Sequence, residues 1–225
     1  MPERADPSEP LPGIQWPLPQ AWPRLRAPLR LGVMASGAGS NFEALVMATR
    51  LGPLEATVEL LVVNNPGCGA QHHATRLQVP WQLHDHRLHS SRAELDHALL
   101  EAFAAAGVDL VVMAGWMRIV TPALIDAFPE RLVNIHPSLL PSFRGLDAVG
   151  QALAAGVNLS GCSAHLVTAE VDAGPILVQA AVPVLDDDDH GRLEARIQRQ
   201  EHRILPLAVA LAAQRLERKA PLDQG

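Results

Sequence analysis

The sequence has almost no lysine, and this shortage limits the partners that the protein can bind. Lysine occurs once among 225 residues, at position 219, and the formal net charge is −6. A nucleic-acid-binding protein needs a stripe of Lys and Arg to neutralise phosphates, so this function class is disfavoured. Any anion site must use arginine side chains or backbone amides.

Cysteines and long apolar runs are also scarce. Cys68 and Cys162 stand far apart and form no CxxC pair. We therefore expect no disulfide framework and no metal site, and we expect the reduced thiols of a cytoplasmic protein. No run of about 18 apolar residues is present, so no membrane span is expected.

Prolines are concentrated at the start of the chain. Residues 1–28 contain eight of the 19 prolines and lack the continuous apolar segment of a secretory signal. This composition favours a segment that packs loosely or not at all. We predict a flexible leader at 1–28, one folded domain at 29–218 and a short tail at 219–225.

The rest of the chain alternates between apolar runs and helical patterns. Alternating strands and helices predict an α/β fold, with a doubly wound, mainly parallel sheet and helices on both faces. Ligands of such sheets lie beyond the carboxyl ends of the strands. The expected strands are 29–34, 56–63, 79–83, 109–113, 131–136, 161–168 and 176–184, and the expected helices include 70–77, 91–106, 122–128, 148–155 and 191–218.

A glycine-rich turn, Ala35–Asn41, follows the first expected strand and opens a helix. Ser40 or Asn41 is the expected N-cap. Free backbone N–H groups and the positive end of the helix dipole suit a phosphate at such a turn. A dinucleotide fingerprint is disfavoured because Phe42 stands where the third glycine belongs, and a Walker loop is disfavoured because it lacks Gly-Lys-Ser/Thr. A monophosphate site at Gly39, Ser40 and Asn41 and a tight turn without a ligand both remain open.

The segment Asn134–Pro141 ends the expected strand at 131–136. Residues two apart in a strand point to the same face, so Asn134 and His136 project together. An amide and an imidazole at a strand end can hold a carbonyl oxygen and move a proton. A capped strand end with a buried histidine is the alternative. Pro137 stops the strand because it cannot donate to a ladder.

Two further loops follow expected strands. The loop 114–120 carries apolar residues that either cover the core or form a slot for a flat ring. The loop 169–175 holds two acids, and its Asp172 either serves the chemistry or caps a turn before Gly174. The glycine-rich turn, the loop 114–120 and Asn134–His136 are all expected at the same edge of the sheet.

With these motifs, the sequence closely resembles the phosphoribosylglycinamide formyltransferases, folate-dependent enzymes of purine biosynthesis. The resemblance covers about residues 29–215. It implies the Rossmann-like formyltransferase fold. The matching segments are Ser36–Asn41, Ala114–Ile119, Asn134–Pro141, Glu170–Pro175 and Gln200–His202.

The resemblance implies a role for each motif. Asn134, His136 and Asp172 would be the catalytic residues. The remaining roles divide between two small molecules. The ribonucleotide phosphate and ribose hydroxyls would be bound by Gly39, Ser40, Asn41 and Glu201, and the folate by Arg92, Met117, Arg118, Ile119, Val120 and Asn134.

The implied reaction suits these residue types. The amine of 5-phosphoribosylglycinamide would attack the formyl carbon of 10-formyltetrahydrofolate, the co-substrate. Asn134 and His136 would stabilise the developing oxyanion, a contribution of about 3–4 kcal/mol per donor. Asp172 would favour the protonated form of His136, which could then act as an acid toward the leaving nitrogen. No metal, nucleic acid or membrane is implied, and the enzyme would be a monomer or homodimer.

Several positions depart from the resembled pattern. Ala38 replaces an asparagine, Arg144 a frequent proline, and Asp147 and Val149 frequent histidines. A basic residue at 144 occurs in 10-formyltetrahydrofolate hydrolases and in methionyl-tRNA formyltransferases. Hydrolysis is therefore the first alternative, although an N-terminal regulatory domain is expected there. A tRNA enzyme would need a C-terminal nucleic-acid-binding domain. A ribonucleotide-binding protein without turnover is a further alternative.

Overall fold

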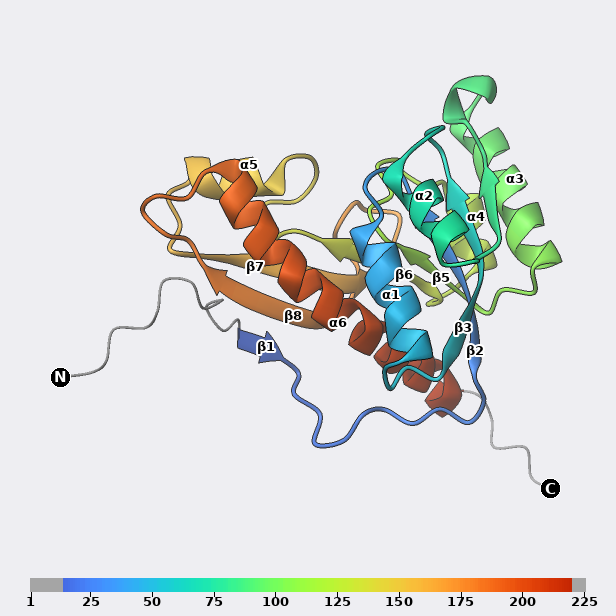
Figure 1. The fold of residues 1–225 in the computed structure, drawn as a ribbon, viewed down its shortest axis with the longest axis horizontal. Coiled ribbons are helices and arrows are strands. Elements are labelled where there is room, and N and C mark those ends of the chain that lie inside the picture. Colours follow the sequence, from blue (N-terminus) through green and yellow to red (C-terminus); the bar gives the residue numbers. More distant parts are fainter. Residues whose placement is uncertain (1–13, 220–225) are drawn as a thin grey trace.

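The structure, a computed structural model, describes residues 14–219, which form one eight-stranded sheet with helices on both faces (Figure 1). The strands are β1 (Ile14–Trp16), β2 (Leu29–Ala35), β3 (Ala56–Val63), β4 (Trp81–Leu83), β5 (Leu110–Met113), β6 (Leu132–His136), β7 (Leu159–Leu166) and β8 (Ile176–Pro183). The α-helices are α1 (Ser40–Arg50), α2 (Gly69–Arg76), α3 (Arg92–Ala105), α4 (Pro122–Ala127), α5 (Ala148–Ala154) and α6 (His190–Lys219), and a 3-10 helix spans His86–Leu88.

The strand order is β1-β8-β7-β6-β5-β2-β3-β4. The five strands from β4 to β6 run parallel. Strand β7 pairs antiparallel with β6, β8 with β7, and β1 with β8. Strand β5 reads Leu-Val-Val-Met and is buried throughout, as expected for a parallel strand covered on both faces. The predicted mainly parallel α/β sheet is confirmed.

Two apolar layers cover the sheet. Helices α1, α2 and α6 pack on one face, where α6 crosses β7 and β8 (Figure 1). Helices α3 and α4 pack on the other face through Leu99, Phe103 and Leu124. The predicted doubly wound arrangement is therefore confirmed. No helix within residues 14–219 combines the length and the apolar character needed to cross a membrane.

The register aligns the ends of three neighbouring parallel strands. Met34 of β2 pairs with Met113 of β5, and Met113 pairs with Asn134 of β6. Neighbouring strands lie about 4.8 Å apart, so the segments that follow β2, β5 and β6 emerge within roughly 10 Å of one another. This edge carries the three loops that the sequence singled out.

Residues 14–28 form an ordered segment, which we call the N-terminal strap. Its strand β1 pairs with β8, and Trp22 packs against the core. Glu55 accepts hydrogen bonds from Arg24 at 2.8 Å and from the Leu25 amide at 3.2 Å. The predicted flexible leader is thus wrong for residues 14–28, because long-range pairing orders a proline-rich segment. Residues 1–13 of the predicted leader, and 220–225 of the predicted tail, lie outside the described residues.

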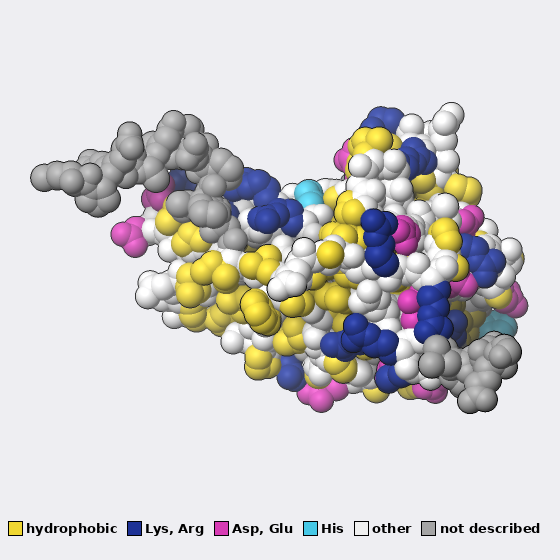
Figure 2. All heavy atoms as spheres, turned by 90° about the horizontal axis from the view of Figure 1, so that it is seen from below, with side chains coloured by type: hydrophobic (Ala, Val, Ile, Leu, Met, Phe, Trp, Pro, Cys, Tyr) yellow, Lys and Arg dark blue, Asp and Glu magenta, His cyan; other side chains and the backbone are white. Residues whose placement is uncertain are grey.

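The outer face of the strap is apolar. Ile14 and Trp16 are 77% and 73% exposed. Figure 2 shows hydrophobic side chains gathered on this side of the molecule, over β1 and β8. The strap therefore contributes buried contacts through Trp22 and an exposed apolar surface through β1.

The strap offers two tryptophans for a matched test. Replacing Trp22 with alanine should lower the free energy of unfolding by about 1–3 kcal/mol, because its ring packs against the core. Replacing the exposed Trp16 should change it by less than about 0.5 kcal/mol. Urea unfolding of both variants measures the difference. Equal losses would contradict the assigned packing of the strap.

Candidate active site

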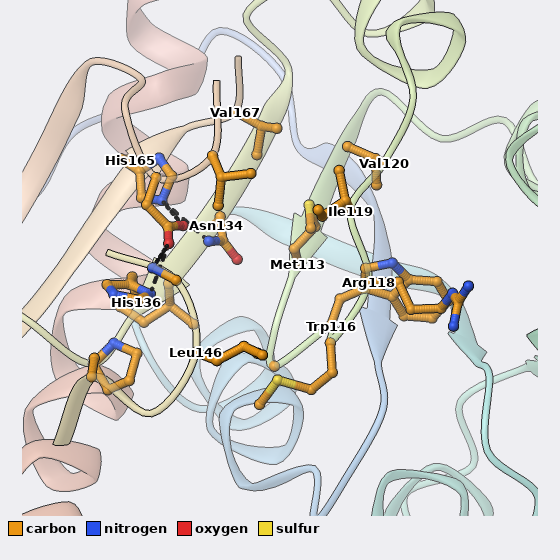
Figure 3. A pocket seen from close by; sticks show the side chains of 18 of the residues that line it. Met113, Trp116, Arg118, Ile119, Val120, Asn134, His136, Leu146, His165 and Val167 are labelled. Atoms are coloured by element: carbon orange, nitrogen blue, oxygen red, sulfur yellow. Dashed lines mark hydrogen bonds and ion pairs between the residues drawn. The ribbon is translucent and has the colours of Figure 1, made fainter. Parts of the chain in front are cut away.

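A cavity of about 590 Å³ opens at the edge where β5, β6 and β7 meet their loops. This volume lies in the range typical of sites for small molecules. Figure 3 shows two unlike walls: Asn134, His136 and His165 form a polar wall, while Met113, Trp116, Ile119 and Val120 form an apolar wall. The cavity therefore offers a slot for a flat apolar group beside a cluster of titratable groups.

Strand pairing explains the polar wall. Asn134 pairs with His165 across the antiparallel β6–β7 ladder, and His136 is the last residue of β6. Asn134 and His136 line the cavity together, in agreement with their predicted common face. Their neighbour His165 is 2% exposed, and sequence reasoning missed it because the pairing of β6 with β7 cannot be read from the sequence.

His136 is held by contacts at both ring nitrogens. Its Nε2 lies 2.8 Å from the carbonyl oxygen of Phe143, which can only accept, so Nε2 donates. Its Nδ1 lies 3.4 Å from Asp172 Oδ2. Both ring nitrogens thus face oxygen acceptors. The ring is 6% exposed, and its orientation is fixed.

Asp172 lies between the two histidines, in the loop that joins β7 and β8. Its Oδ1 is 3.6 Å from His165 Nε2, and its Oδ2 accepts a hydrogen bond of 2.9 Å from the Gly145 amide. Burial raises the pKa of Asp172, but the contact with His165, the Gly145 amide and the charge of His136 together lower it below its ordinary value. Asp172 is therefore a carboxylate at neutral pH.

The apolar wall comes mainly from the loop after β5. Met117, Arg118, Ile119 and Val120 all line the cavity, as does Arg92 from the start of α3. Met117 is 73% exposed although apolar. Figure 3 shows Arg118 extending away from the polar wall. The predicted folate residues, Asn134 included, are thus brought to one cavity.

Asp96 of α3 anchors the same loop. Its Oδ2 accepts a hydrogen bond of 2.5 Å from the Thr121 amide, just after Val120. Burial raises the pKa of Asp96, although this hydrogen bond and the charge of Arg118 oppose the rise. Sequence reasoning missed this contact because it joins residues that no local pattern relates.

The glycine-rich turn leads into α1 with Gly39 as the N-cap. Gly39 is left-handed, with φ 84°, and no side chain caps the helix. The prediction that Ser40 or Asn41 would be the N-cap is wrong, because the turn at Gly39 starts the helix one residue earlier. A Cβ atom at Gly39 would lie 2.4 Å from Ala70 Cα of α2, so only glycine fits. The first amides of α1 remain without a side-chain partner, as an anion site requires.

Helix α6 holds the side chains that follow this turn. Glu201 accepts a hydrogen bond of 2.7 Å from Asn41, and Gln198 donates one of 2.8 Å to Ser40 Oγ. Glu201 is 8% exposed, and burial raises its pKa while the Asn41 bond opposes the rise. The structure thus brings the predicted ribonucleotide residues together and adds Gln198, which sequence reasoning missed. Gln198 lies three residues before Glu201, so the two share one helix face, and this spacing could have identified Gln198 from the sequence.

The turn and the cavity adjoin but are distinct. None of the predicted ribonucleotide residues lines the cavity. Ser36, at the start of the turn, accepts a hydrogen bond of 2.9 Å from the Met117 amide and donates its own amide to the Gly115 carbonyl at 3.0 Å. A ligand with an anionic end and a reactive end can therefore reach from the turn to the polar wall. Within residues 14–219, no three His, Cys, Asp or Glu side chains are grouped to hold a metal ion.

A comparison with protein families identifies the chain. The formyl transferase family model matches residues 29–209. The chain belongs to the formyl transferase family. The match begins with β2 and ends within α6, so it contains every candidate site residue of this formyl transferase. The N-terminal strap precedes the matched residues.

Known proteins show how close the likeness is. A solved structure of glycinamide ribonucleotide transformylase 1 from Symbiobacterium toebii has a TM-score of 0.81 and 44% identity, covering 83% of this chain and 88% of that chain. The phosphoribosylglycinamide formyltransferase of Bacillus subtilis is 36% identical over 80% of this chain and 92% of its own length.

The chain also matches a small part of a much larger relative. The trifunctional purine biosynthetic protein adenosine-3 of Drosophila melanogaster is 44% identical over 81% of this chain. The match covers only 14% of that protein. This chain therefore corresponds to a small part of the trifunctional protein.

Proposed function

We propose that this formyl transferase moves the formyl group of 10-formyltetrahydrofolate to the amine of 5-phosphoribosylglycinamide, a step of de novo purine biosynthesis. The observation that carries the proposal is the cluster of Asn134, His136 and Asp172 between the apolar wall and the glycine-rich turn, whose free amides suit an anion. The names of the Bacillus subtilis and Symbiobacterium toebii relatives support the same substrate.

The ribonucleotide would bind at the turn. Its phosphate accepts hydrogen bonds from the amides around Gly39, Ser40 and Asn41, where the helix dipole favours negative charge. This mode suits a chain with one lysine. Glu201, next to Asn41, accepts hydrogen bonds from the ribose hydroxyls.

The folate would bind along the apolar wall. Its pterin ring enters the slot formed by the loop Met117–Val120, where free main-chain groups can read the ring edge, while Asn134 meets the formyl group. Arg92 at the start of α3 pairs with a carboxylate at the outer end of the folate. An arginine suits this role because its guanidinium binds a carboxylate through two donors.

The reaction needs no bond to the enzyme. The amine nitrogen forms a bond to the formyl carbon, and the bond from that carbon to the folate nitrogen then breaks. His136 gives its ring proton to the folate nitrogen and takes up the proton that the amine loses, which gives tetrahydrofolate and the N-formyl product. Asp172 stabilises the charge of the ring, since the two groups lie 3.4 Å apart.

His165 would decide which end of the Asn134 amide faces the formyl oxygen. Asn134 Nδ2 lies 3.1 Å from His165 Nε2. With a proton on that Nε2, Oδ1 of the amide would accept from His165 and Nδ2 would donate into the cavity. Asp172 Oδ1 lies 3.6 Å from the same nitrogen. Asn134 can then stabilise the developing oxyanion.

Turnover by the purified protein tests the proposal. Tetrahydrofolate should appear from 10-formyltetrahydrofolate only when 5-phosphoribosylglycinamide is present, with one N-formyl product per tetrahydrofolate. Replacing His136 with alanine should lower kcat by about 10²–10⁴ and leave ribonucleotide affinity intact, because His136 lies outside the turn.

Two other outcomes would contradict the proposal. Equal release without the ribonucleotide, with formate as the product, would indicate a hydrolase. Ribonucleotide binding without any release would indicate a binding protein.

The turn allows a second prediction with a matched control. Replacing Gly39 with alanine should weaken ribonucleotide binding about tenfold or more, because the new Cβ collides with α2 and shifts the amides that hold the phosphate. Replacing Gly37 should have little effect, since a Cβ there meets nothing within 4 Å. Calorimetric titration with the ribonucleotide measures both. Equal affinities would contradict the assigned phosphate site.

The cytoplasmic location, the monomeric or homodimeric state and the absence of a metal requirement stay predictions. The assignment of individual residues to catalysis, ribonucleotide binding and folate binding is likewise a proposal, which the variants above test at His136 and Gly39.

A further inference from the structure

Two loops meet over His136, and both carry unusual backbone conformations. One runs from Pro141 to α5, and the other joins β7 to β8. Five non-glycine residues between 14 and 219 have positive φ, and three of them, Phe143, Asp147 and Asp172, lie in these loops. Such conformations cost free energy and persist only where surrounding contacts hold them. The contacts between the loops therefore decide where Asp172 stands.

The loops are joined by two adjacent contacts. Arg144 Nη1 lies 2.7 Å from Glu170 Oε1, and the next residue, Gly145, donates its amide to Asp172 Oδ2 at 2.9 Å. Gln151 of α5 fixes the first loop by donating to the Arg144 carbonyl at 3.2 Å. The ion pair and the hydrogen bond thus form one connection, with the Asp172 carboxylate at its inner end.

We propose that Arg144 and Glu170 are positioning residues, whose ion pair holds the two loops together and so fixes the Asp172 carboxylate against His136. The inference rests on the proposed function, because it concerns turnover at the same site. Neither residue touches the reacting atoms. Arg144 instead keeps the Gly145 amide on Asp172, and Glu170 keeps the opposite loop within reach.

The ion pair of Arg144 and Glu170 is the salt bridge that joins the two loops. Asp172 faces His136 from β6 and His165 from β7, and both are fixed by their strands. Farther along the rim, Asp147 and His190 pair with each other at 3.1 Å.

The size of the effect follows from exposure. The side chains of Arg144 and Glu170 are 40% and 74% exposed, so their attraction is modest and is screened by salt. Arg144→Glu or Glu170→Arg should each lower kcat about two- to fivefold at low ionic strength. KM for the ribonucleotide should not change, because its turn lies elsewhere. Combining both substitutions restores the attraction and should restore kcat to within about twofold.

The pH profile separates positioning from general stability. Loss of the Gly145 hydrogen bond removes one cause that lowers the pKa of Asp172, so this pKa should rise in each single variant. The acid limb of the kcat profile should then move to higher pH, because Asp172 acts as a carboxylate. The carboxyl carbon resonance of Asp172, assigned with an Asp172→Asn variant, reports this titration without any turnover.

A second ion pair of similar exposure provides the control. Arg192 and Asp187 pair at 2.6 Å with side chains 58% and 77% exposed, and neither lines the cavity. Reversing either charge there should change neither kcat nor the Asp172 titration.

The kcat measurements and the Asp172 titration together distinguish failure of the inference from failure of the proposed function. An inactive wild-type protein would overturn the function, and the Asp172 titration alone would then decide the inference. In an active protein, the inference holds only if kcat and the Asp172 titration both shift in the single variants and both return in the double variant. A change in one without the other, or in neither, would overturn it.

Discussion

The burial of one carboxylate, Asp172, constrains the architecture of the site. A carboxylate removed from water is costly unless hydrogen bonds and opposite charges compensate. Here the compensation comes from His136, His165 and the Gly145 amide, and together these contacts lower the pKa of Asp172 despite its burial. The two histidines come from neighbouring strands, and the amide comes from a facing loop. The site can exist only where the sheet brings these three elements together.

The sheet does so by changing direction at β6. The strands from β4 to β6 run parallel, so their carboxyl ends form one edge with the glycine-rich turn and the apolar loop. Strand β7 then pairs antiparallel with β6 and returns His165 beside Asn134. The β7–β8 loop starts beside the beginning of β6, where the Val167 amide donates to the Leu132 carbonyl, and it runs back so that Asp172 reaches His136 at the end of β6. Parallel strands thus supply the glycine-rich turn and the apolar loop, and the antiparallel pair completes the polar wall.

Much of this could be predicted from the sequence because the signals are local. Three features follow from short-range rules: buried runs such as β5, the shared face of Asn134 and His136, and the start of the helix expected at 91–106. At that start the Ser91 hydroxyl accepts a hydrogen bond of 3.1 Å from the Glu94 amide. The features that sequence reasoning missed depend on pairing between distant segments. His165 joins the site through strand register, Gln198 through the packing of α6 on the turn, and β1 through an edge of the sheet. The N-cap prediction was wrong because it relied on the preference for Ser and Asn side chains at N-caps. Gly39 instead adopts a left-handed conformation and begins the helix one residue earlier.

The charge of Asp172 is the central claim, and an isosteric substitution tests it most directly. Asp172→Asn keeps the shape and the Gly145 contact but removes the negative charge beside His136. We expect kcat for formyl transfer to fall by roughly 10²–10⁴, with dissociation constants for both substrates nearly unchanged. Asp147→Asn, at another left-handed aspartate on the cavity rim, should stay close to wild type. An Asp172→Asn protein that turns over within about threefold of wild type would contradict the account.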